Sequence, residues 1–108
     1  AKVNISIIAY TVFGARHALE TLSQLIAVSS TGKSTPKTMV MVDQAKIVDK
    51  PVYRHRGLLI DTSRNYLSVS AIMRMIDGLA ATKMNVLHWH ATDSQSFPLY
   101  IKSRPQMT

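Results

Sequence analysis

The chain of 108 residues contains 13 Lys and Arg against 6 Asp and Glu, so its formal net charge is +7. Its hydrophobic fraction of 46% excludes a disordered tail, and no apolar run approaches the roughly 18 residues of a membrane-spanning helix. The absence of cysteine excludes disulfides and thiolate metal sites. Because the basic residues are scattered along the sequence and not gathered in one stretch, we expect no nucleic-acid partner.

The first fifty residues carry strand and helix patterns in turn. Residues 3–7 alternate between apolar and polar side chains, which predicts a strand with one buried face. Thr11 is predicted to cap a helix that runs to about Ala27. Two short β-type runs at residues 38–42 and 45–48 then predict a hairpin.

The loop between the helix and the hairpin contains a motif that resembles a phosphate-binding loop. Its Thr-Gly-Lys-Ser stretch spans residues 31–34, but Ala27 stands where such a loop requires glycine. The stretch also follows a predicted helix, whereas a phosphate-binding loop follows a strand. We therefore interpret it as an ordinary surface loop.

The second half of the chain has the pattern of a strand–helix–strand unit. Pro51 favours a linker, and residues 57–61 form a compact apolar run typical of a strand buried on both faces. Ser68 or Ser70 can cap the helix that follows, and residues 85–90 form the next strand. This order within about 35 residues predicts a βαβ unit with two parallel strands.

These patterns predict an α/β protein with a domain boundary at Pro51, which separates residues 1–50 from residues 51–108. One βαβ unit cannot bury both faces of its own strands, and the common folds built on such units need well over 108 residues. We therefore expect the chain to be an internal fragment of a longer protein.

His88, His90 and Asp93 could form a metal site. The two histidines are two residues apart and share one face of the predicted strand, and Asp93 follows three residues later. Such a group can bind zinc or another divalent ion in a metal-dependent hydrolase. The alternative is that the histidines serve as hydrogen-bonding groups near the strand end. A small basic binding module is a further alternative from a different class.

Arg64 and Asp93 each follow the carboxyl end of one predicted parallel strand. Ligands of parallel α/β folds bind at this edge of the sheet. The planar guanidinium of Arg64 could hold hydroxyl groups or a carboxylate there. The alternative is an ordinary surface ion pair between the two side chains.

Three stretches of the chain match one known family. They are HRGLLIDTSRNY at residues 55–66, NVLHWHATDSQSFP at residues 85–98 and FGARHALETLSQL at residues 13–25. All three resemble glycoside hydrolase family 20, the β-N-acetylhexosaminidases, and the last resembles a helix of the small domain that precedes the catalytic barrel. The form of residues 92–98 is most similar to insect enzymes that act on chitooligosaccharides. Many relatives carry a second Asp where this chain has Ser94, so no role of that acid is transferred.

The resemblance implies the end of a small α/β accessory domain at residues 1–50 and the first βαβ unit of a (β/α)₈ barrel at residues 51–108. It also implies a retaining, substrate-assisted enzyme that removes terminal non-reducing N-acetylglucosamine or N-acetylgalactosamine. The Asp-Glu pair that such catalysis needs is absent from this sequence, so we expect the isolated chain to be inactive.

The resemblance also implies roles for individual residues. Arg64 matches the residue that binds the 3- and 4-hydroxyls of the sugar, and Asp93 matches the carboxylate that orients a His from a later loop. Asp61, His88 and His90 would support this edge. The family implies no cofactor, no metal, a secreted or lysosomal enzyme whose signal peptide lies outside these residues, and a homodimer of the full-length protein as a candidate assembly.

Overall fold

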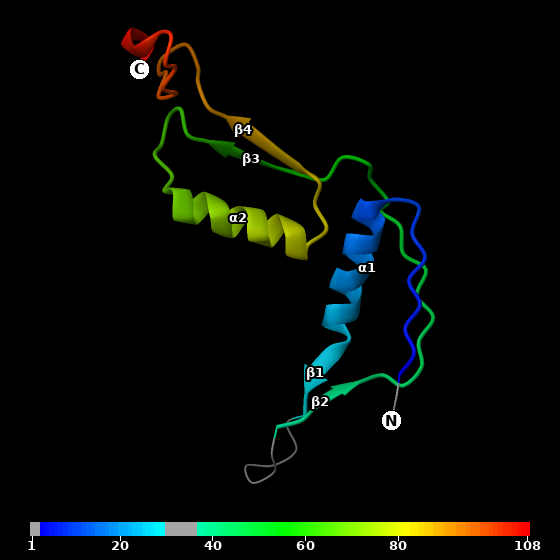
Figure 1. The fold of residues 1–108 in the computed structure, drawn as a ribbon. Helices are drawn as coiled ribbons and strands as arrows, with labels where there is room; N and C mark the ends of the chain where they lie inside the picture. Colours follow the sequence, from blue (N-terminus) through cyan, green and yellow to red (C-terminus); the bar gives the residue numbers. More distant parts are fainter. Residues whose placement is uncertain (1–2, 30–36) are drawn as a thin grey trace. The chain divides into compact units, whose positions relative to one another are not determined.

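A computed structural model of the chain describes residues 3–29 and 37–108. The chain divides into two compact units, Ala1–Lys50 and Pro51–Thr108 (Figure 1). The motif at residues 31–34 lies outside the described residues. No helix in the described part of the chain is long and apolar enough to cross a membrane.

The first unit contains the predicted helix, α1, which spans Val12–Gln24. Thr11 caps it as expected, because its Oγ1 accepts a hydrogen bond from the backbone N–H of Gly14 at 3.0 Å. The helix ends before Ala27, the predicted end, and the strand β1 follows at Ile26–Val28. Branched side chains at both ends of β1 favour the extended backbone over a further helical turn.

The predicted hairpin is wrong. The strand β2, Met39–Met41, pairs antiparallel with β1, and residues 45–48 form no strand. The two residues between the predicted strands are Asp43 and Gln44, and a tight hairpin turn favours a glycine-containing pair that adopts positive φ. The sequence there lacks the residues that would close the turn.

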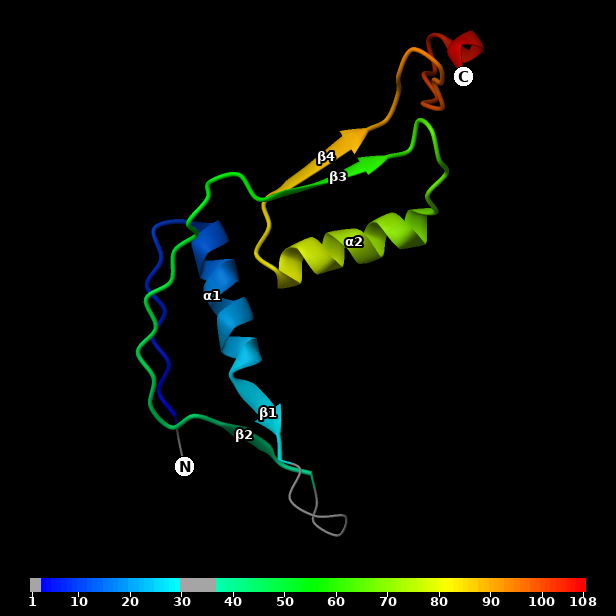
Figure 2. The same cartoon turned by 180° about the vertical axis from the view of Figure 1, so that it is seen from behind.

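The alternating stretch at the start of the chain is extended but is not assigned as a strand. Residues 3–9 run beside the segment that follows β2 (Figures 1 and 2). Alternation specifies which side chains share a face, whereas a strand also needs a hydrogen-bonded partner at the correct register. The structure assigns no such partner within the described residues.

The second unit contains the predicted βαβ arrangement. The strand β3, Gly57–Asp61, is parallel to β4, Val86–His90, and the register pairs Gly57 with Val86 and Asp61 with His90. Between them lies the helix α2, Val69–Ala81. A short 3₁₀ helix, η1 (Pro105–Met107), follows near the chain end.

The sheet of the second unit is covered by α2 on one side (Figures 1 and 2). Ile60 of β3 and Ile72 of α2 are the buried hydrophobic residues of the described chain. Leu59, on the opposite face of β3, is exposed, so the prediction that this strand is buried on both faces is wrong for the described residues. The reason is that α2 covers only the face that carries Ile60.

Arg56 fixes the amino ends of the two strands. Its Nε donates a hydrogen bond to the carbonyl of Lys83 at 2.9 Å, and its Nη1 donates to the carbonyl of Tyr53 at 2.7 Å. Its backbone N–H donates to Oδ1 of Asn85 at 2.9 Å. This network lies at the opposite end of the strands from Asp61 and His90.

Candidate functional site

The loop after β3 presents Arg64 at the carboxyl edge of the sheet. Asp61 ends the strand, and its Oδ1 accepts hydrogen bonds from the backbone N–H groups of Ser63 and Arg64 at 2.9 and 3.1 Å. Its Oδ2 accepts a hydrogen bond from Nη1 of Arg64 at 3.0 Å. The backbone N–H of Arg64 lowers the pKa of Asp61, and the carboxylate of Asp61 raises the pKa of Arg64. The carboxylate thus fixes one side of the guanidinium of Arg64, whose side chain remains 56% exposed.

The loop after β4 repeats this turn around Asp93. Its Oδ1 accepts hydrogen bonds from the backbone N–H groups of Gln95 and Ser96 at 2.8 and 2.9 Å. The backbone N–H of Asp93 donates to the carbonyl of Ser96 at 2.9 Å. The N–H of Gln95 makes the largest contribution to lowering the pKa of Asp93 to about 2. Asp93 is therefore ionised at neutral pH although its side chain is only 8% exposed.

The two loops bring Arg64 and Asp93 together, as the parallel strands predicted. Nη2 of Arg64 lies 3.4 Å from Oδ2 of Asp93, and Nε2 of His90 lies 3.5 Å from the same oxygen. The pair joins an Arg64 side chain that is 56% exposed to an Asp93 side chain that is 8% exposed. Within the described residues, neither Oδ2 of Asp93 nor Nε2 of His90 has a hydrogen-bond partner.

The proposed metal ligands do not form a cluster. His90 approaches Asp93, but His88 lies two residues earlier, about 7 Å back along the strand. Across residues 3–29 and 37–108, no three His, Asp or Glu side chains are arranged to hold a metal ion. The structure therefore gives no support to the metal-dependent alternative.

Sequence reasoning missed Ser63, which connects the two loops. Its side chain is buried, and its Oγ donates a hydrogen bond to the carbonyl of Ser96 at 3.0 Å. A usable signal was present in the sequence, because an Asp that ends a strand and is followed by small polar residues is typical of a turn closed by its carboxylate. Asp61 ends β3 in this context, and Asp93, three residues beyond the end of β4, is also followed by serine.

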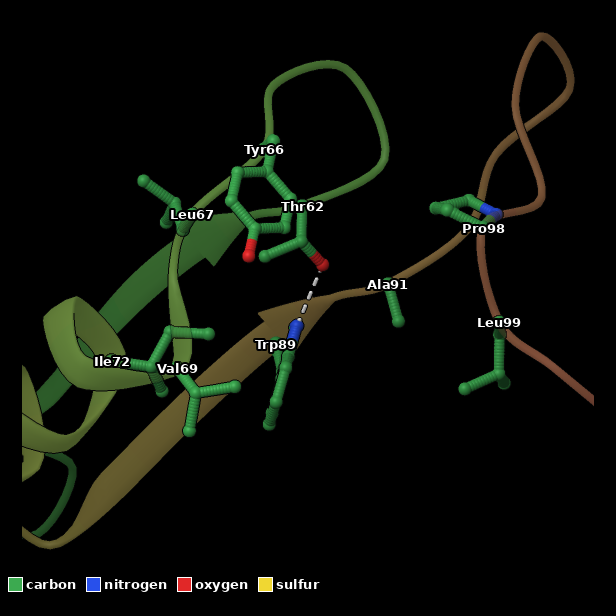
Figure 3. Close-up of a pocket in the computed structure, with 9 residues that line it drawn as sticks. All are labelled: Thr62, Tyr66, Leu67, Val69, Ile72, Trp89, Ala91, Pro98 and Leu99. Atoms are coloured by element: carbon green, nitrogen blue, oxygen red, sulfur yellow. Dashed lines mark hydrogen bonds between the residues drawn. The ribbon is translucent and has the colours of Figure 1, made fainter.

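A pocket of about 480 Å³ lies on the α2 side of the same unit (Figure 3). Val69 and Ile72 of α2 line it together with Trp89, whose Nε1 donates a hydrogen bond to Oγ1 of Thr62 at 2.8 Å. Trp89 alternates with His90 along β4, so the two side chains lie on opposite faces of the sheet. The pocket is therefore separate from the cluster that contains Arg64 and Asp93.

Comparison with known proteins gives matches over most of the chain. The sequence model "Glycosyl hydrolase family 20, catalytic domain" matches residues 53–108. A chitooligosaccharidolytic β-N-acetylglucosaminidase of Ostrinia furnacalis is 48% identical over 106 residues, and that of Bombyx mori is 47% identical over 107 residues. These alignments cover 98% and 99% of this chain but 17% of each relative.

A solved structure also matches. The chitobiase of Flavobacterium johnsoniae superposes with a TM-score of 0.70 at 41% sequence identity. The superposition covers 87% of this chain and 13% of the chitobiase. The similarity therefore includes the arrangement of the elements as well as the sequence.

Proposed function

Because the chain belongs to glycoside hydrolase family 20, we propose that it forms part of a β-N-acetylhexosaminidase. Such an enzyme hydrolyses terminal non-reducing N-acetylglucosamine or N-acetylgalactosamine from glycans or chitooligosaccharides. The observation that carries the proposal is the Arg64–Asp93 pair at the carboxyl edge of two parallel strands, within the segment that matches the catalytic domain. Ligands of parallel α/β folds bind at this edge.

In this proposal Arg64 binds the 3- and 4-hydroxyls of the terminal sugar. Asp61 fixes one side of the guanidinium. Because the Arg64 side chain is more than half exposed, its other N–H groups remain accessible to a ligand. A planar guanidinium can donate to two neighbouring hydroxyls at once. The sugar ring would thereby be held in one orientation at the sheet edge.

Asp93 orients a second group and does not touch the sugar. Its pKa of about 2 keeps it charged, and its Oδ2 has no hydrogen-bond partner among the described residues. We assign this oxygen to a His from another part of the enzyme, which in turn contacts the acid Glu. Asp93 thereby sets the orientation of that His and influences the pKa of the acid.

The reaction proposed for the whole enzyme uses the substrate's own 2-acetamido group. Its oxygen attacks the anomeric carbon while the acid Glu protonates the departing glycosidic oxygen, so that one C–O bond forms as the other breaks. Water then opens the oxazolinium intermediate with retention of configuration. This route needs no carboxylate nucleophile, because the acetamide oxygen takes that role.

We further propose that residues 51–108 begin a (β/α)₈ barrel and that residues 1–50 end the accessory α/β domain. The uncovered face of the β3–β4 sheet supports this, because the interior of a barrel needs a strand face without helices. A secreted or lysosomal location and a homodimer of the full-length enzyme belong to the same proposal.

The test uses a chromogenic aryl N-acetylglucosaminide and two polypeptides. The complete enzyme that contains this segment should release the aglycone. The 108-residue chain alone should release none, because its sequence contains no adjacent Asp-Glu pair. An inactive complete enzyme would refute the proposed function, and an active 108-residue chain would refute the assignment of the acid to another segment.

A further inference from the structure

We propose that Ser63 is a positioning residue, which links the Arg64 loop to the Asp93 loop and so sets the geometry of sugar binding. The inference rests on the proposed function, because it concerns the same site. It adds a residue whose hydroxyl faces a neighbouring loop and is not assigned any contact with the substrate.

Ser63 belongs to one turn and is hydrogen-bonded to the other. Its backbone N–H donates to Oδ1 of Asp61 in the first turn, and its Oγ donates to the carbonyl of Ser96 in the second. The same carbonyl accepts the N–H of Asp93, and the N–H of Ser96 donates to Oδ1 of Asp93. A single hydroxyl therefore joins the two turns that hold the functional side chains.

The burial of Ser63 makes this link effective. The residue is 7% exposed, so water competes little for its hydroxyl. In contrast, the adjacent Arg64 is 56% exposed, and its Nη2 is 3.4 Å from Oδ2 of Asp93. A contact at that distance between an exposed and a buried group constrains the loops weakly. The buried hydrogen bond is the stronger restraint on their separation.

The Ser63→Ala substitution removes the link and leaves the Ser96 carbonyl with the N–H of Asp93 as its donor. It also removes the contribution of the Ser63 side chain to the low pKa of Asp93. We expect the KM of the complete enzyme for a chromogenic N-acetylglucosaminide to rise roughly 3- to 10-fold, the effect of one net hydrogen bond. Ser68→Ala is the matched control, since Ser68 caps α2 and its loss should lower the melting temperature without changing KM.

A double-mutant cycle separates positioning from general stability. If Ser63 acts through Arg64, Ser63→Ala should change KM less than about 2-fold in an Arg64→Lys background, because contacting residues are not additive. The same fold-change in both backgrounds would overturn the proposal. So would a normal KM combined with a lower melting temperature, because that pattern indicates a purely structural role.

A second variant covers the case in which Ser63→Ala does not fold. The nearly isosteric Ser63→Cys then replaces it, and an unchanged KM in that variant refutes the proposal because a thiol is a weak donor. If the wild-type enzyme lacks hexosaminidase activity, the proposed function fails and this inference fails with it. An active wild type with a normal KM in the Ser63 variants overturns the inference alone.

Discussion

Replacing Arg64 with Lys tests the site most directly, because it keeps the positive charge and removes the planar fork. The guanidinium serves two carboxylates from different nitrogens, with Nη1 3.0 Å from Oδ2 of Asp61 and Nη2 3.4 Å from Oδ2 of Asp93. A lysine ammonium is a single donor centre on a flexible stem. It cannot keep both contacts and also present two donors to neighbouring sugar hydroxyls.

The expected size of the effect follows from the loss of one hydrogen bond between a charged donor and a sugar hydroxyl. Such a bond changes an equilibrium by roughly 10- to 150-fold, so kcat/KM for Arg64→Lys should fall by about that factor. The 3- and 4-hydroxyls keep the same bonds during the reaction, so the contact is made in both the ground state and the transition state. Most of the loss should therefore be a higher KM, with a smaller change in kcat.

The assay is steady-state hydrolysis of a chromogenic N-acetylglucosaminide by the complete enzyme. Arg74→Lys is the matched control, because Arg74 is an exposed residue of α2 and the same chemical change there should leave KM and kcat unaltered. Unchanged kinetics in Arg64→Lys would remove this residue from the site. A lower kcat at constant KM would show that it acts on the transition state alone and would refute the assigned role in sugar binding.

Two other substitutions probe the remaining parts of the unit. The pKa of Asp93 is lowered from 3.8 to about 2, so its charged form stabilises the fold above about pH 4 and that contribution is lost as the pH falls towards 2. Between about pH 5 and pH 2 the melting temperature of the wild type should therefore fall further than that of Asp93→Asn, and parallel curves would contradict this. Arg56→Ala removes hydrogen bonds to the carbonyls of Tyr53 and Lys83, so it should lower the free energy of unfolding by about 2 kcal/mol in chemical denaturation. The KM of the complete enzyme that carries Arg56→Ala should equal that of the wild type. An altered KM would mean that the amino end of the strands also contributes to the site.

Local sequence signals predicted the elements of the second unit because the determining contacts are short in range. The side chain of Ser68 accepts a hydrogen bond from the backbone N–H of Ala71, so α2 begins where the sequence indicated. Thr11 caps α1 in the same way by accepting a hydrogen bond from Gly14. The strand–helix–strand order then leaves parallel pairing as the natural connection. That pairing alone places Arg64 and Asp93 at one edge, so the main feature of the site could be predicted from the sequence.

The pairing of β2 could not be predicted in the same way, because it depends on a distant segment. Residues 38–42 have strand propensity and could pair either with residues 26–28 or with residues 45–48. The short connection at residues 43–44 favoured residues 45–48 as the partner. The structure pairs Met39–Met41 with Ile26–Val28 instead. Propensity identifies a residue as extended but does not identify the strand that it pairs with. The link through Ser63 was missed for a related reason, since it joins residues 33 positions apart.

The unpartnered oxygen of Asp93 indicates that the cluster is one part of a larger site. Oδ1 receives two backbone N–H groups, whereas the buried Oδ2 has only the longer contacts with Arg64 and His90 in the described chain. A buried charged oxygen without a hydrogen bond is destabilising, and proteins normally supply a donor. The hydrogen bonds that the carboxylate accepts, that of the Gln95 N–H above all, lower the pKa of Asp93 and favour its charged form. A donor from another segment would satisfy this requirement, which is the reason for assigning Oδ2 to an orienting His.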